Sequence, residues 1–305
     1  MRIAVDVGNS HLSFSTRTSG GLSTVSVAWS ANARTFHLGD TDSPLDLGAY
    51  LQQSLFASIH AVKPTLSDGQ TGDPCSWWIS SVNPPATEQL RFVLQQLRPE
   101  DAVFEINQSM IPLDDDLENR HKTGVDRLLA AWFASRYGET KQTATEPSAR
   151  GVIVVDAGSA VTVDWVDGAG VFRGGMIYPG FRLAANSLHR DTAALPLLTE
   201  FKCTTPPTAA GRATAPAIEA GLFWSQWGGL CGAVEALQRH ACQSELTVGS
   251  DAEHFGQPRV IVTGGGIRAF ESLLPSHWHW EPQLLPQAIL KLADEMRSEA
   301  LNGRG

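Results

Sequence analysis

A short sequence near the N-terminus returns in the middle of the chain, and this repetition constrains the fold more than any other feature. The segment Ala4–Ser10 reads AVDVGNS, and the segment Val154–Ala160 reads VVDAGSA. In both copies an apolar run ends in an Asp-x-Gly turn, and a second strand-like run follows, at Leu12–Thr16 and at Val161–Val166. Self-similarity at half the chain length predicts one supersecondary unit that is used twice.

Between these copies, short β-branched runs alternate with longer amphipathic segments, which is typical of an α/β fold. At roughly 100–200 residues per domain, a chain of 305 residues is expected to form two domains. Strands are predicted at Ile3–Val5, Trp77–Val82, Val152–Val155 and Val260–Thr263. Helices are predicted at Leu45–Ile59, Ala86–Leu97, Val125–Tyr137, Ala217–Ala241 and Pro286–Leu301. Loops are predicted at Pro64–Pro74, Glu139–Arg150, Thr204–Pro216 and Gln243–Pro258.

Composition and charge narrow the possible partners. The formal net charge is −9, and the 23 Lys and Arg residues are scattered, so we expect no nucleic-acid partner. Anionic small molecules stay possible, because backbone N–H groups, helix N-termini and metal ions can bind phosphate. The four cysteines are too few and too far apart for a disulfide framework or a zinc knuckle. The N-terminal segment has neither a signal-peptide core nor a membrane span, so we expect a cytoplasmic protein without a membrane partner.

The two Asp-x-Gly turns are the strongest candidates for chemistry. Glycine lets the backbone approach a ligand closely, and neighbouring hydroxyl and amide groups donate to phosphate oxygens. The carboxylate repels phosphate, so it suits a site where Mg²⁺ binds together with a nucleotide. An ordinary hairpin is the alternative, because Asp, Gly and Asn are common turn residues. Two copies at half-chain spacing favour the functional interpretation.

Three further regions allow both a structural and a chemical interpretation. Gly264–Gly266 follow a predicted strand and form either a tight loop or room for a nucleotide base. In Lys122–Arg127, Asp126 either favours the helix dipole, the better interpretation in isolation, or contributes chemistry. Gly174–Gly180 and Thr192–Pro196 are a turn and a helix end, or they line a pocket for an acidic substrate. The chain has no Walker-type lysine motif, so cations and backbone would have to balance any phosphate charge.

Taken in order, the motifs DVGNS, GVDR, VVDAGSAVTVDWV, GGMIYPG, TAALP and VTGGG resemble those of type III pantothenate kinases, and the related Bvg accessory factor proteins look similar too. The resemblance implies an α/β fold of two ribonuclease-H-like domains, as in the actin-like ATPase superfamily, with an inter-domain nucleotide cleft. It places the first phosphate loop in residues 1–118. Residues 119–305 would hold the catalytic Asp, the second phosphate loop and the adenosine loop.

The resemblance also implies a role for individual residues. Asp126 would be the general base in the phosphorylation of pantothenate by ATP, the first step of coenzyme A biosynthesis. Asp6 would lie near the Mg²⁺ of the nucleotide, and Asp156 would hold a monovalent cation, K⁺ or NH₄⁺. The remaining implied contacts are ATP at Asp6, Val7, Gly8, Asn9, Ser10, His11, Leu12, Ser13, Ser159, Gly264 and Gly265, and pantothenate at Gly124, Val125, Asp126, Arg127 and Thr192. A homodimer is implied as well.

Three residues depart from the family pattern. The family usually has Asn-Thr-Asn or a close variant after the first glycine, and His11 exchanges the amide side chain for an imidazole. Leu117 stands where a substrate-contacting Tyr is common, and Arg120 stands where a Pro is common. These departures motivate two alternatives to the leading hypothesis. One is a catalytically weak or inactive nucleotide-binding accessory or regulatory homologue, and the other is a kinase of another small alcohol.

Overall fold

A computed structural model describes residues 1–30, 35–37, 44–45, 51, 74–137, 151–198, 206–246 and 257–302. The predicted loop 139–150, nearly all of the predicted helix 45–59 and all but the last residue of the predicted loop 64–74 lie outside these residues. The chain forms two compact units, each built from segments that are not continuous in sequence. The first unit comprises Met1–Ile111, Thr123–Leu129 and Leu285–Gly305, and the second comprises Pro112–Lys122 and Ala130–Leu284.

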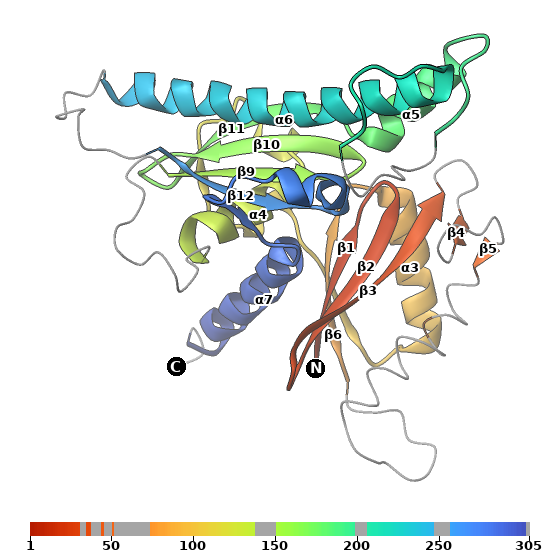
Figure 1. The fold of residues 1–305 in the computed structure, drawn as a ribbon. Helices are drawn as coiled ribbons and strands as arrows, with labels where there is room; N and C mark the ends of the chain where they lie inside the picture. The colour runs from red at the N-terminus through yellow and green to blue at the C-terminus, as the bar shows by residue number, and fades with distance from the viewer. Residues whose placement is uncertain are drawn as a thin grey trace. The chain divides into compact units, whose positions relative to one another are not determined.

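The first unit is built on a seven-stranded sheet with the order β5-β4-β3-β2-β1-β6-β7. Strand β1 pairs antiparallel with β2, β2 pairs antiparallel with β3, and β1, β6 and β7 run parallel (Figure 1). The strands are β1 (Arg2–Val7), β2 (His11–Thr18), β3 (Gly21–Ser30), β4 (Thr35–His37), β5 (Pro44–Leu45), β6 (Ser76–Ser81) and β7 (Ala102–Glu105). The helices are α3 (Pro84–Leu97), the 3₁₀ helix η2 (Gln108–Met110) and α7 (Leu284–Asn302).

Alternation along β1 determines which face of this sheet is apolar. Ile3, Val5 and Val7 pack with Trp77 of β6 and Leu90 of α3 in one buried cluster. The side chains between them in sequence, including Asp6, therefore point to the opposite face. Helix α3 begins with two prolines, at its first two positions, and is capped by the Asn83 side chain, which accepts a hydrogen bond from the Ala86 N–H.

The second unit is built on a six-stranded sheet with the order β13-β12-β9-β10-β11-β8. Strands β9, β10 and β11 are antiparallel neighbours, and β9, β12 and β13 run parallel. The strands are β8 (Asp114–Asp115), β9 (Val152–Ala157), β10 (Ala160–Val166), β11 (Val171–Pro179), β12 (Arg259–Thr263) and β13 (Trp278–Trp280). The helices are the 3₁₀ helices η3 (Arg120–Lys122) and η4 (Gly265–Leu273) together with α5 (Phe181–Arg190) and α6 (Thr214–Leu246). Helix α4 (Val125–Tyr137) is divided between the two units.

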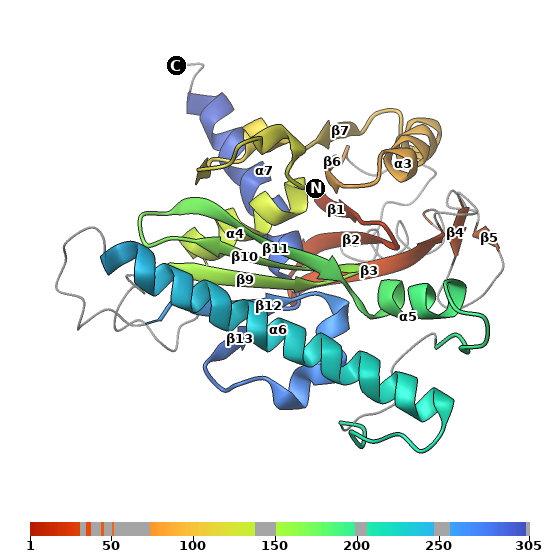
Figure 2. The same ribbon diagram turned by 90° about the horizontal axis from the view of Figure 1, so that it is seen from above.

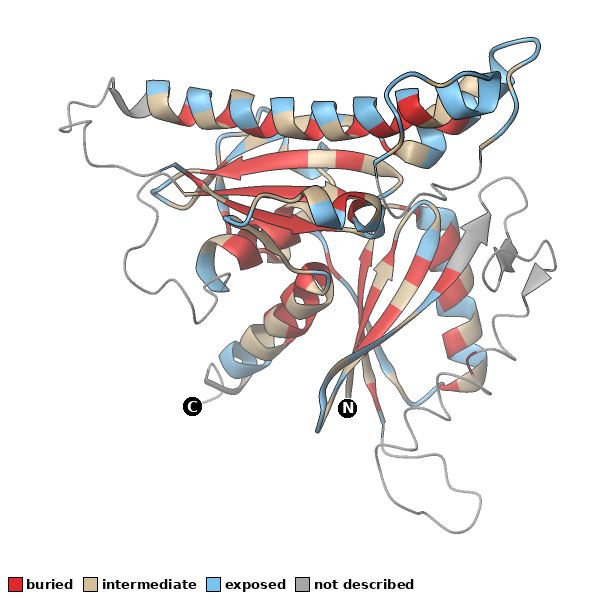
Figure 3. Ribbon diagram, in the orientation of Figure 1, coloured by how far each residue is buried: buried red, intermediate tan, exposed pale blue. Residues whose placement is uncertain are grey.

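Helix α6 covers one face of the second sheet. It lies across β9 and β10 (Figure 2), and its Leu230, Val234 and Leu237 pack on Val155 and Val163 in a second buried cluster. Figure 3 shows the resulting pattern, with buried turns of α6 facing the sheet and exposed residues on its outer side. No helix in the described ranges is both long enough and apolar enough to cross a bilayer.

The two sheets share one topology, which confirms the predicted duplication and the expected α/β fold with two ribonuclease-H-like units. Strands β1, β2, β3, β6 and β7 correspond in order and direction to β9, β10, β11, β12 and β13. The division after residue 118 does not coincide with the compact units, because the start of α4 and the C-terminal helix belong to the first unit. We keep that division as a proposal about the duplicated halves.

Most predicted elements are confirmed, and three boundaries or types differ. Helix α6 begins at Thr214 and continues to Leu246, so it extends into both flanking segments that were predicted as loops. Gly174–Gly180 is not a turn, because β11 continues through Pro179 and pairs with β10. Gly265 and Gly266, which were predicted as part of a loop, belong to a helix, because the 3₁₀ helix η4 begins at Gly265.

Candidate active site

The first Asp-x-Gly turn connects β1 to β2 in the first unit. Strand β1 ends at Val7 and β2 begins at His11, which leaves the three residues Gly8, Asn9 and Ser10 between the two strands. The Gly8 N–H donates to the His11 carbonyl oxygen at 2.9 Å, and the Asn83 side-chain amide donates to the Gly8 carbonyl oxygen at 3.3 Å. Because Asn83 also caps α3, it fixes the N-terminus of that helix beside the turn. Asp6, at the end of β1, is half-buried.

The second turn connects β9 to β10 in the second unit and is one residue shorter. Ala157 pairs with Val161, and the Gly158 N–H donates to the Ala160 carbonyl oxygen at 3.0 Å. The Gly180 N–H donates to the Ser159 carbonyl oxygen at 3.0 Å, and Gly180 is the N-cap residue of α5. Each turn is therefore held against the N-terminus of a helix, which is a favourable environment for an anion.

The three glycines after β12 lie against this second turn. Gly264 has a φ of 92°, a backbone conformation that favours glycine. A Cβ atom there would lie 2.5 Å from the Ala157 carbonyl oxygen and 2.5 Å from Asp156 Oδ1. Gly265 is exposed, and a Cβ atom there would meet no described heavy atom within 4 Å. Gly264 is thus required by close packing, whereas a side chain at position 265 would meet open space.

Asp126 lies in the first turn of α4, within the first unit. Its Oδ1 atom accepts a hydrogen bond from the Arg127 N–H at 2.8 Å. Gly124 packs so closely that a Cβ atom added to it would overlap Asp126 Oδ1, and the same atom would contact Val82 Cγ1 at 3.7 Å. Burial raises the pKa of the Asp126 carboxyl, and the N–H and charge of Arg127 oppose this shift without cancelling it. The carboxylate is therefore a stronger base than an ordinary aspartate.

Asp126 and the first turn lie at the same edge of the first sheet. Strands β1 and β6 run parallel, so their carboxyl ends meet at one edge, and the Val82 N–H donates to the Val7 carbonyl oxygen at 3.1 Å. Gly124, which packs on Val82, brings the start of α4 to that edge. Asp126 is half-buried, and it is positioned by its neighbours Gly124 and Arg127 in the first unit.

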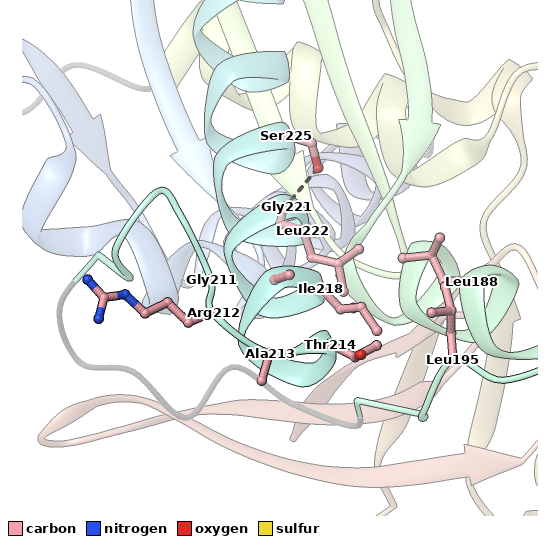
Figure 4. A pocket seen from close by; sticks show the side chains of 11 residues that line it. Leu188, Leu195, Gly211, Arg212, Ala213, Thr214, Ile218, Gly221, Leu222 and Ser225 are labelled. Atoms are coloured by element: carbon pink, nitrogen blue, oxygen red, sulfur yellow. Dashed lines mark hydrogen bonds between the residues drawn. The ribbon is translucent and has the colours of Figure 1, made fainter.

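Thr192 is placed differently from the other candidates of the second unit. It is exposed, and its hydroxyl donates to the Leu188 carbonyl oxygen at 2.6 Å, which closes the end of α5. Beside it lies an open cavity of about 740 Å³ between the end of α5 and the start of α6 (Figure 4). The Arg212 side chain extends away from Leu188 and Leu195 in this view. The cavity lining comprises Leu188, Leu195, Gly211, Arg212, Ala213, Thr214, Ala217, Ile218, Gly221, Leu222 and Ser225.

Arg120 and Leu117, which depart from the family pattern, both contact neighbouring residues of the second unit. Arg120 donates to the Leu113 carbonyl oxygen at 2.6 Å and forms an ion pair with Asp115, so it ties the β8 segment together. Leu117 packs toward Gly174 of β11, where a Cβ atom would lie 3.7 Å from its Cδ2 atom. Asn83 was not among the predicted site residues, although an Asn before two prolines is a recognisable helix-capping signal.

The residues present fit a metal that arrives with a nucleotide. Within the described residues, no group of three or more His, Cys, Asp or Glu side chains is arranged to hold a metal ion. Mg²⁺ in nucleotide sites takes one or two carboxylates and completes its coordination with phosphate oxygens and water. A single carboxylate at the first turn, that of Asp6, is consistent with this mode.

Comparison with known proteins identifies the family. Residues 2–238 match the family model described as type III pantothenate kinase. Proteins of that name from Rhodopirellula baltica and Chlorobaculum parvum are 33% and 30% identical to this chain, over 70% and 75% of it and 70% and 79% of their own lengths. A third, from Chlorobaculum tepidum, is 32% identical over 65% of this chain and 66% of its own length. With these motifs in this order and most of its length matched, the chain belongs to the type III pantothenate kinase family.

Proposed function

We propose that this protein transfers a phosphoryl group from ATP to the primary hydroxyl of pantothenate, giving 4′-phosphopantothenate in the first step of coenzyme A biosynthesis. The observation that carries the proposal is the position of Asp126. Its carboxylate packs closely against Gly124, accepts a hydrogen bond from the Arg127 N–H, and lies at the same sheet edge as the first Asp-x-Gly turn. Retention of this carboxylate is the reason not to favour a catalytically inactive accessory homologue.

Asp126 acts as the general base toward the acceptor hydroxyl. A phosphoryl transition state is loose, so catalysis depends mainly on placing the acceptor and balancing charge, and little proton removal precedes attack. A carboxylate whose pKa is raised by burial is a better proton acceptor than an ordinary one. Arg127 supplies fixed positive charge on the adjacent position of α4. Gly124, Val125 and Thr192 complete the proposed contacts with pantothenate.

The two turns hold the nucleotide and its cations. Residues Asp6–Ser13 and Ser159 are proposed to contact the phosphates, and Gly264 and Gly265 are proposed to border the adenosine. Asp6 would hold Mg²⁺ through the nucleotide, and Asp156 would hold K⁺ or NH₄⁺. These cations supply the positive charge that a Walker-type lysine provides elsewhere. We further propose that the protein is a cytoplasmic homodimer, a stoichiometry that light scattering on the purified protein would measure.

Product analysis tests the proposed reaction. The purified chain is incubated with ATP, Mg²⁺, K⁺ and pantothenate, and the products are identified by mass spectrometry and ³¹P NMR. We expect one new phosphomonoester on the primary hydroxyl of pantothenate. A folded protein that phosphorylates another small alcohol from an acceptor panel, and not pantothenate, would contradict the substrate assignment.

A further inference from the structure

A hydroxyl side chain lies beside the turn aspartate on the neighbouring parallel strand of the first sheet. Ser80 of β6 is the register partner of Asp6 of β1. Register partners on parallel strands point to the same face, and this face is opposite the apolar cluster that contains Val5 and Ile79. Asp6 and Ser80 are therefore neighbours at the edge of the sheet where the first turn and Asp126 lie.

The second unit repeats this arrangement. Thr263 of β12 is the register partner of Asp156 of β9, on the face opposite the cluster that contains Val155 and Val262. Both hydroxyl residues are buried, with relative exposures of 0% for Ser80 and 4% for Thr263. Each unit therefore has a buried hydroxyl residue at the same register position beside its turn aspartate, and the occurrence in one unit supports the interpretation of the other.

The Ser80 hydroxyl is buried. Its Oγ atom makes no hydrogen bond within the described part of the chain. A buried hydroxyl without a partner gives up its hydrogen bonds to water and gains none in return, and an alanine at the same place would avoid that cost. By contrast, Ser15 of β2 is buried, with a relative exposure of 2%, and its hydroxyl forms a hydrogen bond with the Thr24 hydroxyl at 2.7 Å. A serine at position 80 is therefore unfavourable for folding alone.

We propose that Ser80 is a positioning residue for Asp6, and that Thr263 is its counterpart for Asp156. Each hydroxyl donates a hydrogen bond to the adjacent carboxylate, directly or through one bound water, when the nucleotide and its cations bind. A carboxylate has several lone-pair sites, so one can be held by the hydroxyl while others face the cation. The inference rests on the proposed function for the identity of the nucleotide site.

The first test is the effect of Ser80→Ala on the binding of ATP, measured by calorimetry without pantothenate, with and without Mg²⁺. Losing one hydrogen bond to the carboxylate is expected to weaken Mg·ATP binding roughly three- to tenfold and to leave metal-free ATP binding unchanged. The variant is expected to unfold at the same temperature as the wild type or at a higher one. Ser80→Thr, which introduces the residue used in the second unit, is expected to restore Mg·ATP binding.

Ser15→Ala is the matched control, because it removes a buried serine hydroxyl that has a partner. It is expected to lower the unfolding temperature and to leave Mg·ATP binding unchanged. Thr263→Val removes a hydroxyl at nearly constant shape, and it is expected to raise the K⁺ concentration needed for half-maximal ATP binding roughly three- to tenfold.

Each outcome separates this inference from the proposed reaction. Unchanged Mg·ATP binding in Ser80→Ala, or a loss of stability like that of Ser15→Ala, would overturn the positioning role. If Ser80→Ala does not fold, failure of Ser80→Thr to bind Mg·ATP like the wild type would overturn it as well. If the wild type fails to phosphorylate pantothenate while Ser80→Ala still weakens Mg·ATP binding, the substrate assignment falls and the positioning role stands.

Discussion

Replacing Gly124 with alanine is expected to disable the protein without unfolding it. The added Cβ would overlap Asp126 Oδ1, and the other atoms near it, Asp126 Cγ at 3.6 Å and Val82 Cγ1 at 3.7 Å, are at ordinary contact distance. Oδ1 is the end of a side chain, so the carboxylate can withdraw by about 1 Å to an ordinary van der Waals separation. Gly124 is absent from the glycines with positive φ, so alanine fits its backbone conformation.

A displacement of this size is expected to matter for chemistry far more than for binding. Misplacing a reacting group by about 1 Å can cost on the order of 100-fold in rate. We therefore expect kcat of Gly124→Ala to fall about 100-fold while the Kd for Mg·ATP stays within about threefold of the wild type.

The assay is steady-state ADP release with saturating pantothenate, together with calorimetry for Mg·ATP and a thermal unfolding curve. Gly228→Ala is the control, because that exposed position in α6 has no described heavy atom within 4 Å of an added Cβ. It is expected to keep full activity and to gain about 0.5–1 kcal/mol of stability from the better helix former. A Gly124→Ala variant with near wild-type kcat would refute the inference that the position of the Asp126 carboxylate controls turnover.

Three other predictions concern the carboxylates of Asp126 and Asp101. Asp126→Asn should lower kcat by about 10²–10⁴-fold while Mg·ATP binding measured by calorimetry stays near wild type, and a loss below threefold would exclude a general base. Because burial raises the pKa of Asp126 above the ordinary value of 3.8, its contribution to folding stability is present below that value and is lost as pH rises through the raised pKa. The unfolding temperature of Asp126→Asn should therefore exceed that of the wild type at pH 7, and the gap should close toward pH 4. Burial alone would raise the pKa of Asp101, but hydrogen bonds from Arg98, the Cys75 N–H and Trp77 outweigh burial and lower it. The contribution of Asp101 to folding stability is therefore lost as pH falls through that lowered pKa. Asp101→Asn should destabilise the protein by about 1.5–3 kcal/mol in urea unfolding, because Arg98 keeps its ion pair with Glu100, and it should leave kcat per folded molecule unchanged.

Local patterns predicted the duplicated elements well because each copy carries its own signals. The amphipathic segment Val125–Tyr137 and the apolar runs before the Asp-x-Gly turns predicted α4, β1 and β9 with boundaries close to those observed. The ends of α6 were missed because Thr214–Pro216 and the residues after Ala241 look like loop composition. In the folded chain, the apolar face of α6 packs on the second sheet and overrides this composition.

The residues that position the site were harder to predict because they depend on register between strands distant in sequence. Nothing in the segment Ser76–Ser81 alone indicates that Ser80 lies beside Asp6, and that relation exists only once β6 pairs parallel with β1. The interpretation of Gly174–Gly180 as a turn failed for a similar reason, since pairing with β10 keeps this glycine-containing segment extended. Thr192 was expected to bind substrate, and that role stays a proposal because its hydroxyl donates to Leu188.

The central claim is that this chain uses Asp126 to transfer phosphate from ATP to pantothenate. The most direct measurement is the initial rate of ADP release with Mg²⁺ and K⁺, with and without pantothenate, for the wild type and Asp126→Asn. We predict that ADP release by the wild type depends on pantothenate and that the variant loses this dependence while still binding Mg·ATP. Equal rates with and without pantothenate in a folded wild type that binds Mg·ATP would contradict the claim.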